Sequence, residues 1–210
     1  NPSGLIFSDG FRKTSLRRFL KRSVVLIFSF LMLFVFLPLI AAIALLIKID
    51  SKGPVFFSQE RVGEKGKIYH VHKFRSMADD AEDQSGPVWA ESDDDRVTRV
   101  GKFIRRFRID EIPQLYNVLK GEMSFVGPRP EREYFVKQLE DLIPYYTIRH
   151  TVRPGITGWA QVCYGYGASV EDAVEKLNYD LFYIKNMTTL MDIMIILRTI
   201  KIVLFSKGAR

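Results

Sequence analysis

One uninterrupted apolar run constrains this chain more than any other feature. Residues 24–47, VVLIFSFLMLFVFLPLIAAIALLI, contain no charged side chain over 24 positions. As an α-helix, a run of this length extends about 36 Å, which is enough to cross a hydrocarbon core of about 30 Å. The run therefore predicts a membrane-embedded helix rather than a core helix of a soluble domain.

Pro38 and the charges on both sides of the run favour a helix that turns back. Six cations precede the run within residues 1–22, and four lysines follow it within residues 48–67. Basic flanks stay on the cytoplasmic side of a membrane, and a full crossing would export one of them. Pro38 removes a backbone donor and clashes with the preceding turn. We expect residues 23–48 to form a re-entrant membrane helix broken near Pro38, with a kinked transmembrane span as the alternative.

The net charge of +7 is concentrated at the N-terminal end. Residues 1–22 carry +5 of it, and the remaining 188 residues carry only +2. A nucleic-acid-binding domain would spread its basic excess over the folded part, whereas basic residues beside an apolar segment suit anionic lipid headgroups. We therefore predict a basic juxtamembrane segment over residues 1–22, membrane lipids as a partner, and no nucleic acid.

The sequence pattern of residues 49–210 predicts one cytoplasmic domain. Alternating residues at 54–62 and 67–75, separated by GEKG, predict a β-hairpin. Helical patterns follow at 97–107, 131–142, 169–184 and 190–210. Together these patterns predict an α+β fold that is mostly helical, with one small hairpin and a compact catalytic domain.

The last helical pattern, LMDIMIILRTIKIVLFSKGAR, mixes cations with large apolar residues. Arg198, Lys201 and Lys207 alternate with Ile, Leu and Phe at roughly helical spacing. Such a pattern is typical of an amphipathic helix at a membrane interface, and packing against the domain core is the alternative.

The acid pair Asp110-Glu111 is set among cations in RRFRIDEIPQLYNVLKGEMSFVGPRP, residues 105–130. One interpretation is helix capping, because Pro113 suits a first helical turn and acids stabilise a helix N-terminus. The other interpretation is chemistry. Surrounding arginines would keep both carboxylates ionised, which suits a nucleophile and a metal ligand but not a general acid. Mg²⁺ takes one or two carboxylates together with phosphate oxygens.

Further cations in stiff backbone settings could bind a diphosphate. Arg129 lies in GPRP and Arg153 in RPG. Proline fixes φ and glycine permits tight turns, so each arginine loses little conformational entropy when it binds a ligand. Lys73 and Arg75 share one face of the second predicted strand. Guanidinium groups held in this way match phosphate oxygens, so the sequence predicts a phosphoryl-transfer site at a membrane surface.

Four motifs carry a family resemblance: KFRSM, RIDEIPQLYNVLKGEMSFVGPRP, RPGITGWAQV and YDLFYIKN. In this order they resemble the bacterial sugar transferases known as monotopic phosphoglycosyl transferases. The similarity runs from about residue 17 to the C-terminus. The opening NPSGLIFSDGF and the closing KGAR are similar to the exosortase-associated exopolysaccharide branch of that family.

The resemblance implies transfer of a sugar 1-phosphate from a UDP-sugar to a polyprenyl (undecaprenyl) phosphate, with release of UMP. It implies that Asp110 is the nucleophile, forming an aspartyl-phosphosugar, and that Glu111 holds Mg²⁺. It also implies a place at the bacterial inner membrane, with the catalytic domain facing the cytoplasm, and a role in starting exopolysaccharide assembly. The residues expected to contact substrate are Lys73, Arg75, Arg129, Arg153 and Asp180.

Two alternatives stay open at this point. A metal-dependent membrane glycosyltransferase could use the acidic loop at residues 79–95 and would release UDP instead of UMP. A non-catalytic membrane scaffold would use the acid pair only as a helix cap. The motifs assign neither the sugar nor the oligomeric state.

Overall fold

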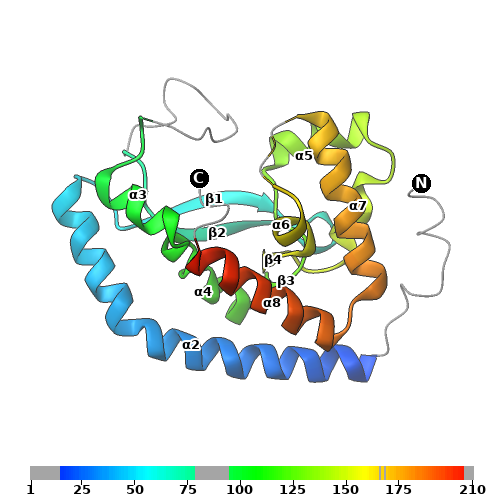
Figure 1. Ribbon diagram of the computed structural model, residues 1–210, viewed down its shortest axis with the longest axis horizontal. Coiled ribbons are helices and arrows are strands. Elements are labelled where there is room, and N and C mark those ends of the chain that lie inside the picture. Colours follow the sequence, from blue (N-terminus) through cyan, green and yellow to red (C-terminus); the bar gives the residue numbers. More distant parts are fainter. Residues whose placement is uncertain (1–14, 79–94, 166, 168, 206–210) are drawn as a thin grey trace.

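The computed structural model describes residues 15–78, 95–165, 167 and 169–205 (Figure 1). The acidic loop, apart from Asp95, lies outside the described residues. So do the opening NPSGLIFSDGF and the closing KGAR.

Helix α2, Ser15–Asp50, contains the apolar run and is the longest element of the fold. It continues through Pro38 without interruption, so the expected break is absent; instead α2 changes direction along its length (Figure 1). A proline inside a helix removes one hydrogen bond and displaces one carbonyl, which bends the helix when its neighbours keep helical dihedrals. Arg22–Asp50 is long and apolar enough to cross a membrane by length and composition, and an 18-residue stretch within it has a mean hydropathy of 3.0.

The predicted hairpin is confirmed. Strand β1, Phe56–Val62, pairs antiparallel with β2, Ile68–Phe74. The short 3₁₀ turn Glu64–Gly66 joins them, and Lys65 and Gly66 both adopt positive φ there. A second sheet pairs β3, Ser124–Val126, in parallel with β4, Gly155–Thr157. The sequence did not predict this sheet, because strands of three residues are too short to show alternation.

Helices and 3₁₀ turns make up most of the remaining domain, which confirms a mostly helical α+β fold. The elements are α3 Arg99–Arg106, η3 Ile109–Glu111, α4 Gln114–Lys120, α5 Glu133–Leu142, η4 Tyr146–Thr151, α6 Trp159–Cys163, α7 Val170–Asn186 and α8 Thr189–Leu204. The largest apolar core gathers side chains of α5, α7 and α8 around Leu181 and Ile195, both fully buried.

Residues of the folded domain contact both the N-terminal half and the C-terminal half of α2. Near its start, Arg22 donates to the carbonyls of Val118 and Leu119 in α4, at 2.7 and 3.0 Å. At its end, Ile43 and Ile47 pack with Phe74 of β2 and Ile104 of α3. The membrane helix is therefore part of the tertiary structure and not an appended anchor.

Asn117 fixes α4 against the hairpin. Its side chain is fully buried, and its Nδ2 donates to the carbonyl of His70 at 2.6 Å and to Glu122 Oε2 at 2.7 Å. Its Oδ1 accepts from the backbone N–H of His72 at 3.1 Å. The side-chain amide of Asn117 thus bonds the backbone of β2 as a neighbouring strand would, and it fixes the position of α4 relative to β2.

Replacing this amide by an apolar side chain should destabilise the fold. Asn117→Leu leaves a buried N–H and a buried carbonyl of β2 without partners, and we expect the free energy of unfolding to fall by about 2–4 kcal/mol. Chemical unfolding in detergent measures this value. Asn186→Leu is the matched control, because Asn186 is exposed and bonds only within its own helix. Equal stability of the two variants would contradict this role.

Candidate active site

The acid pair lies on a strained turn between α3 and α4. Arg108 adopts a left-handed conformation, with φ 53° and ψ 24°, directly before η3. A non-glycine residue in this region costs of order 1 kcal/mol or more and persists where the surroundings fix it. The turn directs Asp110 and Glu111 inward, where they are only 8% and 6% exposed.

Neither acid caps a helix. The N-cap positions of η3 and α4 are Arg108 and Pro113, and neither has a side-chain cap hydrogen bond. Within the described part of the chain, no backbone N–H donates to the carboxylate of Asp110 or Glu111. The capping interpretation of the pair therefore has no support in the geometry.

Three cations from three separate elements surround Glu111. Lys73 Nζ of β2 and Arg129 Nη2 of the loop after β3 each lie 3.2 Å from Glu111 Oε1. Arg108 Nη1 lies 3.5 Å from Oε2. Burial alone would raise the pKa of Glu111, but these three cations lower it below its usual range. Glu111 is therefore ionised, as the sequence predicted.

Asp110 differs from its neighbour. Burial raises its pKa to about 6, and Glu111 adds to this rise, while Lys73, Arg105 and Arg129 oppose it. The sequence predicted that the cations would keep both acids ionised; at Asp110 desolvation outweighs the cations and moves the pKa upward. A pKa below 7 still leaves the carboxylate mostly ionised at neutral pH. No described residue donates a hydrogen bond to it, so its oxygens remain available to a reacting group.

Two of the other predicted residues, Arg75 and Arg153, do not join this cluster. Arg75 is buried and donates to the carbonyls of Lys52 and Ser51, at 2.8 and 2.9 Å, where it closes the end of α2. Arg153 Nε lies 3.4 Å from Glu64 in the hairpin turn, at the opposite end of the hairpin from Lys73. Lys73 and Arg129 are thus the predicted cations that the fold brings to the acid pair.

Asp180 is also placed away from the acid pair, in a buried ion pair that the sequence did not indicate. Its Oδ2 accepts from Arg149 Nη2 at 2.9 Å, and the side chain of Asp180 is only 2% exposed. The same Arg149 nitrogen donates to the carbonyl of Arg129 at 2.8 Å. Sequence reasoning missed Arg149, because one arginine in RHTVRPG carries no sign of burial.

The side chains at the site suit one kind of cation. No group of three or more metal-ligating side chains forms among the residues that the structure describes. The acid pair offers at most two carboxylates, fewer protein ligands than a structural Zn²⁺ site or a protein-bound Ca²⁺ site needs. Mg²⁺ commonly binds through one or two carboxylates, waters and substrate phosphates. The ionised Glu111 beside the unbonded Asp110 fits that pattern.

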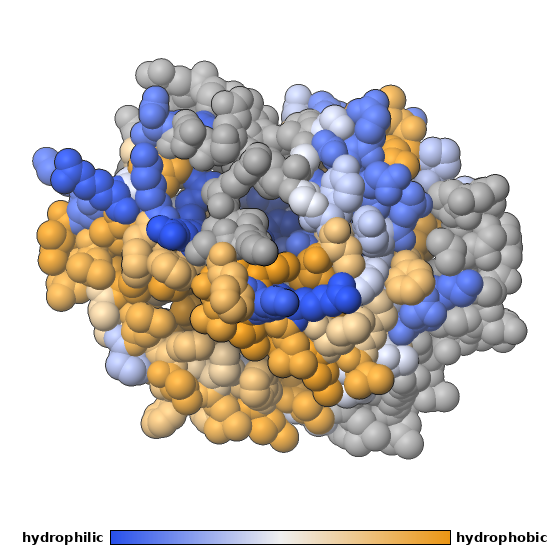
Figure 2. All heavy atoms as spheres, in the orientation of Figure 1, coloured by the Kyte–Doolittle hydropathy of each residue, from blue (hydrophilic) through white to orange (hydrophobic). Residues whose placement is uncertain are grey.

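The surface around the site is divided by polarity. Figure 2 shows a hollow with hydrophilic atoms at its base, between the part carrying α3 and the part carrying α5 and α7. Below it, an apolar band follows α2 and α8 in the orientation of Figure 1. The exposed apolar side chains of these two helices include Phe30, Phe34 and Leu37 on α2 and Leu190, Leu197 and Leu204 on α8.

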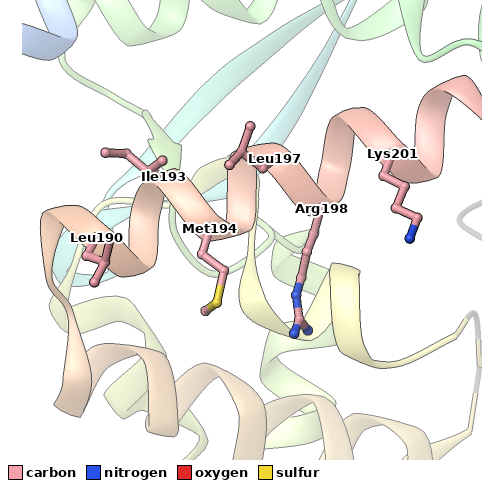
Figure 3. A pocket seen from close by; sticks show the side chains of 6 residues that line it. All are labelled: Leu190, Ile193, Met194, Leu197, Arg198 and Lys201. Atoms are coloured by element: carbon pink, nitrogen blue, oxygen red, sulfur yellow. The ribbon is translucent and has the colours of Figure 1, made fainter.

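A groove of about 310 Å³ runs along α8 within this band (Figure 3). Its lining consists of Leu190, Ile193, Met194, Leu197, Arg198 and Lys201. Arg198 also lies over the ring of Trp159, at 5.0 Å from the ring centroid. The groove contains none of the acid-pair residues and is a separate, mostly apolar feature with a cationic end.

The chain is similar to several bacterial proteins. It is 48% identical over 192 residues to the UDP-N-acetylgalactosamine-undecaprenyl-phosphate N-acetylgalactosaminephosphotransferase of Aeromonas hydrophila, covering 91% of this chain and 45% of that protein. It is 44% identical over 194 residues to the undecaprenyl-phosphate glucose phosphotransferase of Komagataeibacter xylinus, covering 90% and 36%. The chain thus spans less than half the length of these two relatives.

A shorter relative matches over nearly its whole length. The exopolysaccharide production protein PSS of Rhizobium leguminosarum bv. phaseoli is 42% identical over 186 residues, covering 86% of this chain and 93% of that protein. The family model described as bacterial sugar transferase matches residues 16–206, which include α2 from its second residue and every element of the site. This chain therefore belongs to the bacterial sugar transferase family.

Proposed function

We propose that this chain transfers a sugar 1-phosphate group from a UDP-sugar to undecaprenyl phosphate, with release of UMP. Two of the relatives above are named for sugar phosphotransfer to undecaprenyl phosphate, which supports the kind of reaction. The observation that carries the mechanism is the contrast within the acid pair. Glu111 is neutralised by three cations, whereas the carboxylate of Asp110 accepts no hydrogen bond from a described residue.

In the first step, an oxygen of Asp110 attacks the phosphorus that bears the sugar. A bond forms between this oxygen and phosphorus, and the bond from phosphorus to the oxygen shared with UMP breaks. UMP leaves with that electron pair, and the enzyme carries an aspartyl-phosphosugar. Lys73 and Arg129, both beside Glu111, are suited to bind the phosphate oxygens as charge moves onto the leaving group.

In the second step, a phosphate oxygen of the polyprenyl phosphate attacks the same phosphorus. The bond to Asp110 breaks, and its carboxylate is regenerated in the ionised form. The product is a polyprenyl diphosphate sugar. Covalent catalysis lets a water-soluble donor and a lipid acceptor use one small site in turn.

Glu111 would hold a magnesium ion together with the donor diphosphate. When bound, Mg²⁺ neutralises charge on the diphosphate and polarises its phosphorus–oxygen bonds. The cations around Glu111 lie at 3.2–3.5 Å, longer than the 2.7–2.9 Å of tight charge-assisted contacts. Their spacing is compatible with sharing the carboxylate among several partners.

We infer a re-entrant course for α2, which its contacts with the domain support. Arg22 contacts α4 near one end of the apolar run, and Ile47 packs with β2 and α3 at the other. A straight helix from Arg22 to Asp50 is about 42 Å long, so a crossing would separate these ends by a full hydrocarbon core of about 30 Å. Contact of one domain with both ends supports their lying on the same side, which we propose is the cytoplasmic side of the inner membrane.

Helix α8 supports the same placement. Its apolar groove and the cations Arg198 and Lys201 suit acyl chains and anionic headgroups. The apolar band that α2 and α8 share in Figure 2 would then face the lipid, with the hydrophilic hollow opening above it.

Finer assignments stay predictions. The two relatives named for N-acetylgalactosamine and glucose are nearly equally similar, so the donor class is a UDP-hexose or UDP-N-acetylhexosamine. The exosortase-associated branch depends on terminal stretches outside the described residues. The glycosyltransferase alternative depends mostly on the acidic loop, and its product, UDP rather than UMP, separates it from this proposal.

Removing the nucleophile should abolish the covalent intermediate. Incubated with UDP-sugars and no lipid, the wild-type protein should gain the mass of one sugar phosphate, and Asp110→Asn should lose adduct formation and UMP release by at least about 10³-fold. Intact-mass analysis and nucleotide chromatography read the result. Asp141→Asn, at an exposed acid on α5, is the control. An adduct on Asp110→Asn, or UDP as the product, would refute the mechanism.

Metal withdrawal tests the role of Glu111. Chelation should slow adduct formation at least about tenfold, because charge on the diphosphate is then less well neutralised, and added Mg²⁺ should restore it. Glu111→Gln should raise the Mg²⁺ concentration needed for half-maximal rate. An unchanged requirement in Glu111→Gln would show that the metal, if used, is held elsewhere.

The course of α2 can be tested by labelling. In a Cys163→Ser background, cysteines introduced separately as Ser23→Cys and Lys52→Cys flank the apolar run. An impermeant maleimide should label both in inside-out vesicles and neither in right-side-out vesicles, because the ends share one side. Labelling of the two positions from opposite sides would establish a crossing.

A further inference from the structure

We propose that Arg149, oriented by Asp180, is a positioning residue that holds Arg129 in place at the acid pair. This inference rests on the proposed function, and it assigns Asp180 a role different from contact with substrate. It concerns a row of four charged residues that begins in α7 and ends at the acid pair: Asp180, Arg149, Arg129 and Glu111.

Arg149 is an interior cation. Its side chain is 6% exposed, and three partners occupy the guanidinium: Asp180 at 2.9 Å, the carbonyl of Arg129 at 2.8 Å and Tyr146 Oη at 2.6 Å. The guanidinium carbon also lies 5.0 Å from the ring centroid of Tyr146. The Nε–H of Arg149 has no hydrogen-bond partner but is buried, so Arg149 presents no exposed donor to a phosphate and acts on the site through Arg129.

The contact falls on the backbone of the residue whose side chain reaches the site. Arg129 Nη2 lies 3.2 Å from Glu111, and its carbonyl accepts from Arg149. Proline on each side fixes φ at 128 and 130. The neighbouring carbonyls are also held, Pro128 by the N–H of Gly155 at 2.9 Å and Pro130 by Arg61 at 3.1 Å.

Among these contacts, Arg149 adds a charged donor fixed by a second charge. A buried ion pair is a weak source of stability, because desolvation offsets much of its attraction. The pair does, however, restrict the orientation of the guanidinium. When Asp180 holds the guanidinium, its N–H groups can donate to the carbonyl of Arg129 only within a narrow range of angles. The pair thus serves the position of the loop that carries Arg129.

A double-mutant cycle separates positioning from general support of the fold. If Arg149 acts through Arg129, Arg149→Met should slow adduct formation about 10- to 100-fold, as expected when a reacting site is misplaced by about 1 Å. In an Arg129→Met background the same change should add less than about threefold, because the group being positioned is already gone. Arg149→Lys keeps the positive charge but has fewer N–H donors, and it should recover part of the rate.

The assay uses the full chain in detergent, with UDP-sugar and Mg²⁺, and measures the adduct rate as a function of donor concentration. Lys137→Met, at an exposed cation paired with Glu133, is the control and should match wild type. If Arg149→Met fails to fold, Asp180→Asn, which keeps an oxygen acceptor for Arg149, enters the same cycle. Melting temperatures of all variants establish that folded proteins are compared.

The outcomes are distinct. Losses of rate that are not additive in folded variants support the positioning role. Losses that multiply overturn it. A wild-type rate in folded Arg149→Met, or in its substitute Asp180→Asn, also overturns it. If the wild-type protein itself forms no adduct, the proposed function fails and not this inference alone.

Discussion

The structure depends on the neutralisation of one buried carboxylate. Glu111 is 6% exposed, and an ionised group in that setting is stable only with charged partners in contact. Lys73 comes from the hairpin, Arg108 from the turn before η3 and Arg129 from the loop after β3. Three segments that are far apart in sequence must therefore converge on one side chain.

Each of the three segments has its own support. Asn117 ties α4 to β2 and so sets Lys73 against the acid pair. The left-handed Arg108 turns the chain so that its own side chain meets Glu111. The loop of Arg129 is held through its carbonyls. The strain at Arg108 and the buried charges lower stability locally, and this is a common property of sites that carry out chemistry.

The membrane helix belongs to the same arrangement. Arg22 caps the C-terminal carbonyls of α4, and Arg75 caps the end of α2. A cation at a helix C-terminus also complements the helix dipole. Two arginines therefore join the apolar helix to the elements that carry the acid pair.

The sequence by itself determined the apolar helix, the hairpin, the acid pair and two of the cations beside it, because these follow from local periodicity, turn chemistry and motif. Only the tertiary structure decided that α2 bends without breaking, that Arg75 closes a helix end and that Arg153 pairs with the hairpin turn. It also decided that Asp180 is buried against Arg149 and that the two acids differ in pKa. These outcomes depend on which distant segments pack together and how much water they exclude, and no spacing of residues along the chain encodes either quantity directly.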